Sequence, residues 1–201
     1  MMGERGQAVT LEAIIGGLVL LASVLFALQM TAVTPLSAST SSQHIENQLD
    51  ATADGVLATA AADGSLERTV LFFNESAGTF IDPSYQGYYA GEPPDTAFGR
   101  TLEQTFDDRG IAYNLYVTYD YGGDDRTRRV IYRGQPSDNA IRSTTALTLT
   151  DDTPLYNHSD ADGIADPRPV NVSSTDGFYM EDQSTSGLYN VVTVEVVVWR
   201  I

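Results

Sequence analysis

An uninterrupted apolar run near the N-terminus constrains the fold more than any other feature of the sequence. Residues 13–33 read AIIGGLVLLASVLFALQMTAV, and between Ala13 and Leu28 the largest polar side chain is that of Ser23. At about 1.5 Å per residue, a helix of this length extends about 30 Å, close to the hydrocarbon thickness of a bilayer. The run therefore predicts a membrane helix, which would serve as a cleaved secretory signal, a permanent anchor or the core of a filament.

The charges around this run predict its orientation. Arg5 is the only basic residue before it, and the next basic residue is Arg68. Because basic residues are retained on the cytoplasmic side, we expect a single-pass protein with a cytoplasmic N-terminus and an extracellular chain after Val33. The stretch Ala32–Ser39, AVTPLSAS, offers small residues of the kind a signal peptidase cuts, so a secreted soluble product stays open as an alternative.

The residues just before the apolar run resemble the leader of archaeal, haloarchaeal-style type IV pilin-like precursors. In that class a basic residue and a glycine precede a segment that begins with glutamine. The resemblance implies that a prepilin-type peptidase cuts after the glycine, removes residues 1–6 as a leader, and leaves the membrane helix, residues 7–33, as the mature N-terminus. The matching residues are Arg5, Gly6, Gln7, Thr10 and Glu12.

The same resemblance gives Glu12 a role in assembly. A carboxylate at the start of an apolar helix is costly alone in lipid, but it can pair with the free amine of a neighbouring subunit. Cutting after Gly6 makes Glu12 the sixth mature residue, whereas the family pattern has it fifth. The implied partners are the membrane, a prepilin-type peptidase, and like or related pilin subunits.

Residues 34–64 predict an extended amphipathic helix that continues the first one outside the membrane. Pro35 lacks a backbone N–H, so we expect the helix to kink or end there, and Gly64 is a terminator. An apolar stripe on this helix is expected to pack on a globular head, as in a pilin shaft, and a plain stalk is the alternative. The stripe consists of Ile45, Leu49, Ala53, Val56, Leu57 and Ala60.

Residues 65–201 predict an extracellular, β-rich head domain. The expected fold class is α+β, with the long N-terminal helix packed on a mainly antiparallel, pilin-like sheet. The valine-rich C-terminal segment is expected to be a central strand covered on one face by the helix, and residues 151–186 are expected to be a surface loop. The predicted strands are residues 67–73, 111–119, 126–133, 143–150 and 190–201.

Local signals predict two further elements of the head. Asp95 or Thr96 can cap a short helix that runs to Arg109 and buries apolar side chains on one face. The Gly122-Gly123 pair is expected to turn a hairpin between two of the strands.

The charge composition predicts a protein of high-salt surroundings. The 201 residues include 27 Asp and Glu and 11 basic residues, all of them Arg, for a net charge of −16. An acidic, lysine-free surface is typical of halophilic proteins, since molar salt screens carboxylate repulsion within about 3 Å. No nucleic acid is expected as a partner, because binding phosphates needs a clustered basic face. The nearest approach to one, expected to be exposed cross-strand charges of a hairpin, is Arg126, Arg128, Arg129 and Arg133.

The sequence predicts a protein that is not an enzyme and holds no cofactor beyond a low-affinity Ca²⁺ site. His44 and His158 stand outside any nucleophile or metal motif. Asp160, Asp162 and Asp166 overlap part of an EF-hand loop and are candidate metal ligands. However, His158 stands where the first acid belongs, and Pro169 stands where the bidentate glutamate belongs.

Three Asn-x-Ser sequons predict a glycoprotein. They begin at Asn74, Asn157 and Asn171, and none of them contains proline. All three fall in segments predicted to be loops on the outer side of the membrane, which suits N-glycosylation.

Two hypotheses about function follow from these features. The first is a non-enzymatic, membrane-anchored surface protein that acts as a type IV pilin-like structural subunit of a filament or pseudopilus. The second is a single-pass membrane protein whose ectodomain binds a ligand or an envelope partner and does not polymerise. Major pilins, minor pilins and secretion pseudopilins share the features on which the first hypothesis rests.

Overall fold

The computed structural model describes residues 3–158 and 165–200, and within the long helix it leaves aside the side chains of residues 3–8 and 30–42. The chain forms two compact units, residues 1–47 and residues 48–201. Helix α1 (Gly3–Ala62) supplies the first unit and the start of the second. Each unit is described by itself below.

The first unit carries a helical stretch that fits a membrane crossing. Within α1, Val9–Gln29 spans 21 residues with a mean hydropathy of 2.4, and none of it is buried inside the protein. Its large apolar side chains, such as Leu18, Leu20 and Phe26, are more than half exposed. An apolar surface of this size is stable when lipid or other protein covers it. The predicted membrane helix is therefore confirmed as a candidate span near the N-terminus, a position in which signal sequences are also found.

Of the two outcomes expected at Pro35, a kink or an end of the helix, the end is excluded. Helix α1 continues through Thr34 and Pro35 as one element and ends at Ala62. A proline inside a helix loses only its own N–H bond, and the bonds of the neighbouring turns keep the helix continuous. A kink at Pro35 stays a prediction. Gly64, two residues after the end of α1, has a left-handed φ of 76°.

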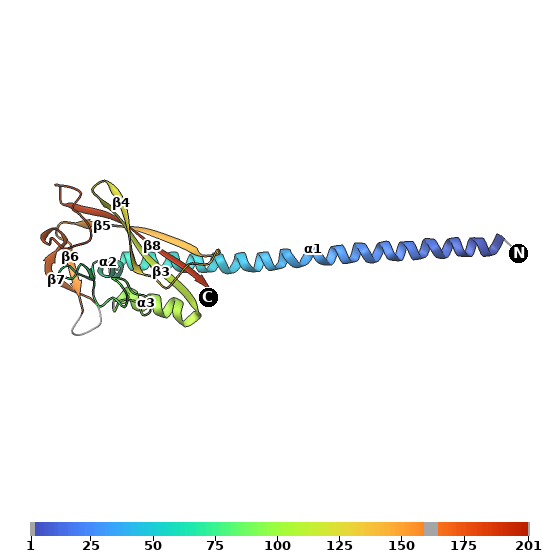
Figure 1. Cartoon of the computed structure of the whole chain (residues 1–201), viewed down its shortest axis with the longest axis horizontal. Helices are drawn as coiled ribbons and strands as arrows, with labels where there is room; N and C mark the ends of the chain where they lie inside the picture. Colours follow the sequence, from blue (N-terminus) through green and yellow to red (C-terminus); the bar gives the residue numbers. More distant parts are fainter. Residues whose placement is uncertain (1–2, 159–164, 201) are drawn as a thin grey trace. The chain divides into compact units, whose positions relative to one another are not determined.

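The second unit, the head, is built around a four-stranded antiparallel sheet in the order β4-β3-β8-β5 (Figure 1). Its strands are β3 (Ile111–Tyr121), β4 (Asp124–Ile131), β5 (Ile141–Thr150) and β8 (Leu188–Arg200). The C-terminal strand β8 lies between β3 and β5, so its prediction as a central strand is confirmed. Gly122 and Gly123 have positive φ angles and turn the predicted hairpin between β3 and β4.

The last turns of α1 belong to the core of the head. Ala53, Leu57 and Ala60 are at most 3% exposed, as the predicted apolar stripe requires. They share one core with alternate valines of β8, including Val194 and Val196. A hydrogen bond from the hydroxyl of Ser143 on β5 to the carboxylate of Asp54 on α1 adds a polar contact at its edge. A fragment that contains only residues 65–201 would lack this part of the core.

The predicted short helix is present as α3 (Ala97–Phe106), followed by the 3-10 turn η1 (Asp107–Arg109). Thr96 caps it by accepting a bond of 3.1 Å from the N–H of Gly99. A Cβ atom on Gly99 would lie 2.0 Å from the carbonyl oxygen of Pro94, so only glycine fits there. The apolar face of α3 is buried in the core through Phe98, Leu102 and Phe106.

The predicted strand at residues 67–73 is wrong. Ser65–Val70 form the helix α2, and only the end of the segment enters the short strand β1 (Phe73–Asn74), which pairs with β2 (Thr79–Phe80). Asp63 accepts a bond of 2.8 Å from the N–H of Ser65, which starts a helical turn. The buried hydroxyl of Thr69 also pairs with that of Thr96 at 2.7 Å. Tertiary contacts override β propensity here.

The prediction of a surface loop over residues 151–186 is also wrong. The segment contains β6 (Pro154–Asn157), which pairs with β7 (Asp166–Asn171), and the 3-10 turn η2 (Val172–Ser174). Although the segment is mostly acidic and polar, its apolar residues Phe178, Tyr179 and Met180 are buried. Tyr179 packs against Phe73 with ring centroids 5.0 Å apart. This segment therefore closes one end of the core.

Replacing Leu57 by Ala should destabilise the head, because it leaves a cavity between α1 and the sheet. Removal of a fully buried leucine side chain costs about 2–5 kcal/mol. Urea unfolding of the full chain in detergent, followed by the fluorescence of the single tryptophan, Trp199, measures the change. Thr59→Ala, at an exposed position of the same helix, is the control and should change stability by less than about 0.5 kcal/mol. Equal midpoints for the two variants would mean that α1 is only a stalk.

Candidate functional site

The leader and assembly residues lie in the first turns of α1. Arg5, Gly6 and Gln7 are helical, and Glu12 has an exposed side chain within the apolar stretch Val9–Gln29. Successive turns of one helix therefore carry the predicted cleavage point and the predicted assembly carboxylate. A carboxylate at this position is costly in the bilayer centre and cheaper at the interface, where it can reach the headgroups.

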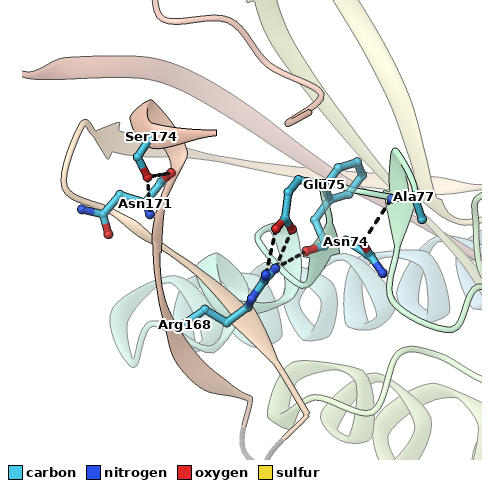
Figure 2. A network of polar contacts seen from close by, with 7 residues as sticks. Asn74, Glu75, Ala77, Arg168, Asn171 and Ser174 are labelled. Atoms are coloured by element: carbon cyan, nitrogen blue, oxygen red, sulfur yellow. Dashed lines mark hydrogen bonds and ion pairs between the residues drawn. The ribbon is translucent and has the colours of Figure 1, made fainter. Parts of the chain in front are cut away.

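The first sequon sits on a firmly held turn between β1 and β2. The exposed side chain of Asn74 accepts a bond of 3.1 Å from the N–H of Ala77 through its oxygen (Figure 2). The glycan-accepting nitrogen is the other atom of the same amide group. Ser76, which completes the sequon, is exposed as well. This asparagine is presented to solvent by the turn.

A partly buried ion pair holds that turn against β7. Arg168 donates bonds of 2.6 and 2.8 Å to the two carboxylate oxygens of Glu75, and a longer one of 3.4 Å to the carbonyl of Phe73 (Figure 2). The hydrogen bond from Arg168 is the main reason that the pKa of Glu75 lies below its usual range. Bidentate pairs of this kind fix geometry as well as charge. The sequence alone does not reveal this contact, because its partners lie far apart in the chain.

The third sequon is tied into the fold. Asn171, at the end of β7, is half-buried, and its backbone N–H and carbonyl both bond the hydroxyl of Ser174, at 3.0 and 2.9 Å (Figure 2). Within the sequon, Val172 is buried, and the hydroxyl of Ser173 donates to the carbonyl of Asp151 at 2.7 Å. A folded head therefore cannot offer this sequon in an extended form.

The remaining candidates for modification and metal binding are only partly described. Asn157 is exposed at the end of β6, and Asp166 is exposed at the start of β7, paired with Asn157 in the ladder. Asp160 and Asp162 lie outside the described residues. Over the described ranges, 3–158 and 165–200, the structure contains no group of three side chains placed to hold a metal ion.

The two histidines occupy different settings. His44 is exposed on α1. His158 lies 2.9 Å from a carboxylate oxygen of Asp82, and its ring packs edge-on against Phe72 at 5.0 Å. The contact joins the end of β6 to the segment that follows β2.

The four arginines of the hairpin region separate into different environments. Arg126 and Arg129 are exposed, as predicted. Arg133 does not fit the prediction, because it bonds both carboxylate oxygens of Asp107 and the hydroxyl of Tyr113. Arg128 is half-buried and lies 4.9 Å from the ring centroid of Tyr179. Alternation along β4 places Arg128 and Arg129 on opposite faces of the sheet.

The comparison with known families covers both units of the chain. A family model described as "Family of unknown function (DUF7288)" matches residues 5–198. The chain belongs to this family. No curated protein and no solved structure matches the chain. Because the match begins at residue 5, the family model includes the apolar stretch of α1 together with the head.

The geometry of the sequons predicts unequal glycosylation. We expect a glycan on Asn74 and none on Asn171 when the full chain is isolated from an archaeal host and its peptides are analysed by mass spectrometry. Ser76→Ala should abolish the modification at Asn74, since it removes the sequon hydroxyl and keeps the contact between Asn74 and Ala77. Ser137→Ala, at an exposed serine outside any sequon, is the control. A glycan on Asn171, or a bare Asn74 in the parent protein, would contradict the prediction.

Proposed function

We propose that this protein is a non-enzymatic, type IV pilin-like subunit of a surface filament or pseudopilus. The observation that carries the proposal is that α1 contributes both a membrane-length apolar stretch and a part of the core of the head. Its N-terminal part contains the apolar stretch Val9–Gln29, none of which is buried in the protein, and its last turns contain Ala53, Leu57 and Ala60 in the core of a β-rich head. A subunit whose anchor helix is also a core element of its head is suited to assembly by helix stacking.

The residues ahead of the apolar stretch support the same proposal. Arg5, Gly6 and Gln7 provide the cleavage signal, and Glu12 provides a carboxylate for the amine that cleavage would create on a neighbour. Such a pair would be formed where lipid or packed helices exclude water, and it would fix the axial register between subunits. A monomer would tolerate Glu12 by letting it reach the membrane interface.

The setting that we propose is the outer face of a cell membrane in a saline environment. The N-terminus is cytoplasmic and the head extracellular, by the positive-inside rule. The net charge of −16 with no lysine suits molar salt, and the exposed sequon at Asn74 suits a glycosylated surface. Assignment as an archaeal, halophilic protein rests on these sequence features.

The proposal predicts that the mature chain begins at Gln7 in cells that contain a prepilin-type peptidase. Intact-mass analysis of the purified full chain, from cells with and without the peptidase, measures this. A start at Met1 or Met2 in both strains would contradict the proposal and would favour an anchored protein that does not polymerise. A start within or after Ala32–Ser39 in both strains would favour a secreted product.

The Glu12→Ala variant tests the proposed role of this carboxylate in filament assembly. Leader cleavage and membrane insertion should persist, because the apolar stretch and the cleavage signal are unchanged, while the amount of subunit in sheared filaments should fall several-fold. Ser23→Ala is the control within the same stretch, where the Ser23 hydroxyl donates only to carbonyls of its own helix, at 2.6 and 3.0 Å. Equal recovery of both variants would mean that Glu12 is an interfacial residue without an assembly role.

A further inference from the structure

A polar hollow lies on the outer face of the four-stranded sheet, which is the face turned away from the core shared with α1. We name it the outer-face groove. Its volume is about 400 Å³, within the range of about 300–1,000 Å³ that is common for small-molecule sites. Its lining side chains come from all four strands of the sheet and from the loop after β4.

The floor of the outer-face groove is a row of hydroxyl groups. Thr127 on β4, Thr118 on β3 and Thr193 on β8 are aligned by the strand register. The hydroxyls of Thr118 and Thr127 are 2.9 Å apart and form a hydrogen bond. Each hydroxyl can donate one bond and accept others, so the row retains capacity for a ligand rich in hydroxyl groups.

The neighbouring row brings charge and an aromatic ring to the floor. Register aligns Arg129 on β4 with Tyr116 on β3 and Glu195 on β8. Arg142 on β5 donates to Glu195 at 2.8 Å, which leaves the groove with one positive charge in excess. Arg129 forms no ion pair with the part of the chain that the structure describes, and its guanidinium lies 4.3 Å from the ring centroid of Tyr132.

The wall of the groove is held in place before any ligand arrives. The buried amide of Asn114 donates to the hydroxyl of Tyr116 and to the carbonyl of Gly134, both at 2.9 Å. The second bond fixes the start of the loop that carries Gln135. Tyr132 packs edge-on against Tyr88 at 5.9 Å. Preorganised aromatic and amide groups reduce the entropy that binding would cost.

We propose that the outer-face groove binds a carboxylated saccharide. Sugar hydroxyls match the threonine row and the Gln135 amide, while the apolar face of a sugar ring matches the rings of Tyr116 and Tyr132. The carboxylate pairs with Arg129, which no acid of the groove neutralises. An acidic peptide would also satisfy the arginine, and its backbone groups could bond the hydroxyls, but it has no ring face to pack on Tyr116 and Tyr132. Binding of this kind would be independent of subunit assembly.

Titration of the full chain in detergent with trigalacturonate, at one fixed salt concentration, tests the proposal by calorimetry. The neutral methyl ester of the same trisaccharide and a triglutamate peptide are the comparison ligands. We expect trigalacturonate to bind at least about tenfold more tightly than either, because only it combines a carboxylate for Arg129 with sugar hydroxyls and a ring face for the two tyrosines. Arg129→Ala should reduce its affinity about tenfold and leave that of the methyl ester unchanged.

Two further variants keep the test decisive. Arg129→Lys retains the charge but not the planar fork, so it should restore part of the affinity. Arg100→Ala, which removes an exposed arginine paired with Asp95 on another surface, should have no effect on binding. Triglutamate binding as tight as that of trigalacturonate would overturn the saccharide assignment. Absence of trigalacturonate binding, or an equal loss for Arg100→Ala and Arg129→Ala, would overturn the site itself.

Discussion

The burial of the α1 stripe against the sheet is the contact on which the rest of the structure depends. Ala53, Leu57 and Ala60 lie in the same core as β8. The hydrogen bond between Asp54 and Ser143 also connects the helix to the edge strand β5. With its inner face covered, the sheet turns its other face to solvent, where the outer-face groove lies. The contact thus couples the helix that bears the membrane stretch to the head that bears the sequons.

Much of the fold could be predicted where local signals and the final structure agree. The apolar stripe of α1, the cap of α3 at Thr96, the hairpin at Gly122 and Gly123, and the central position of β8 were all predictable from periodicity, capping and valine content. The errors fall where tertiary contacts decide. Residues 67–70 were expected to begin a strand that ends at Phe73, but they form part of a helix, because Asp63 starts a turn and Thr69 bonds Thr96.

The candidate sites were less predictable because they depend on register and on distant pairing. A sequence marks Asn74, Asn157 and Asn171 as equivalent, whereas the fold exposes Asn74 and ties the sequon of Asn171 into a 3-10 turn. The outer-face groove required strand register to align Arg129 with Tyr116 and Glu195. Glu12 and the cleavage motif were visible in the sequence, and their roles stay predictions that rest on resemblance.

Hydrogen exchange of the full chain in detergent tests most directly whether the end of α1 is part of the head. Amides in the turns around Ala53, Leu57 and Ala60 should exchange as slowly as those of the central strand β8, since one cooperative core protects both. Fast exchange in these helical turns beside a protected β8 would contradict the account, because it would make α1 a stalk attached to an independent head.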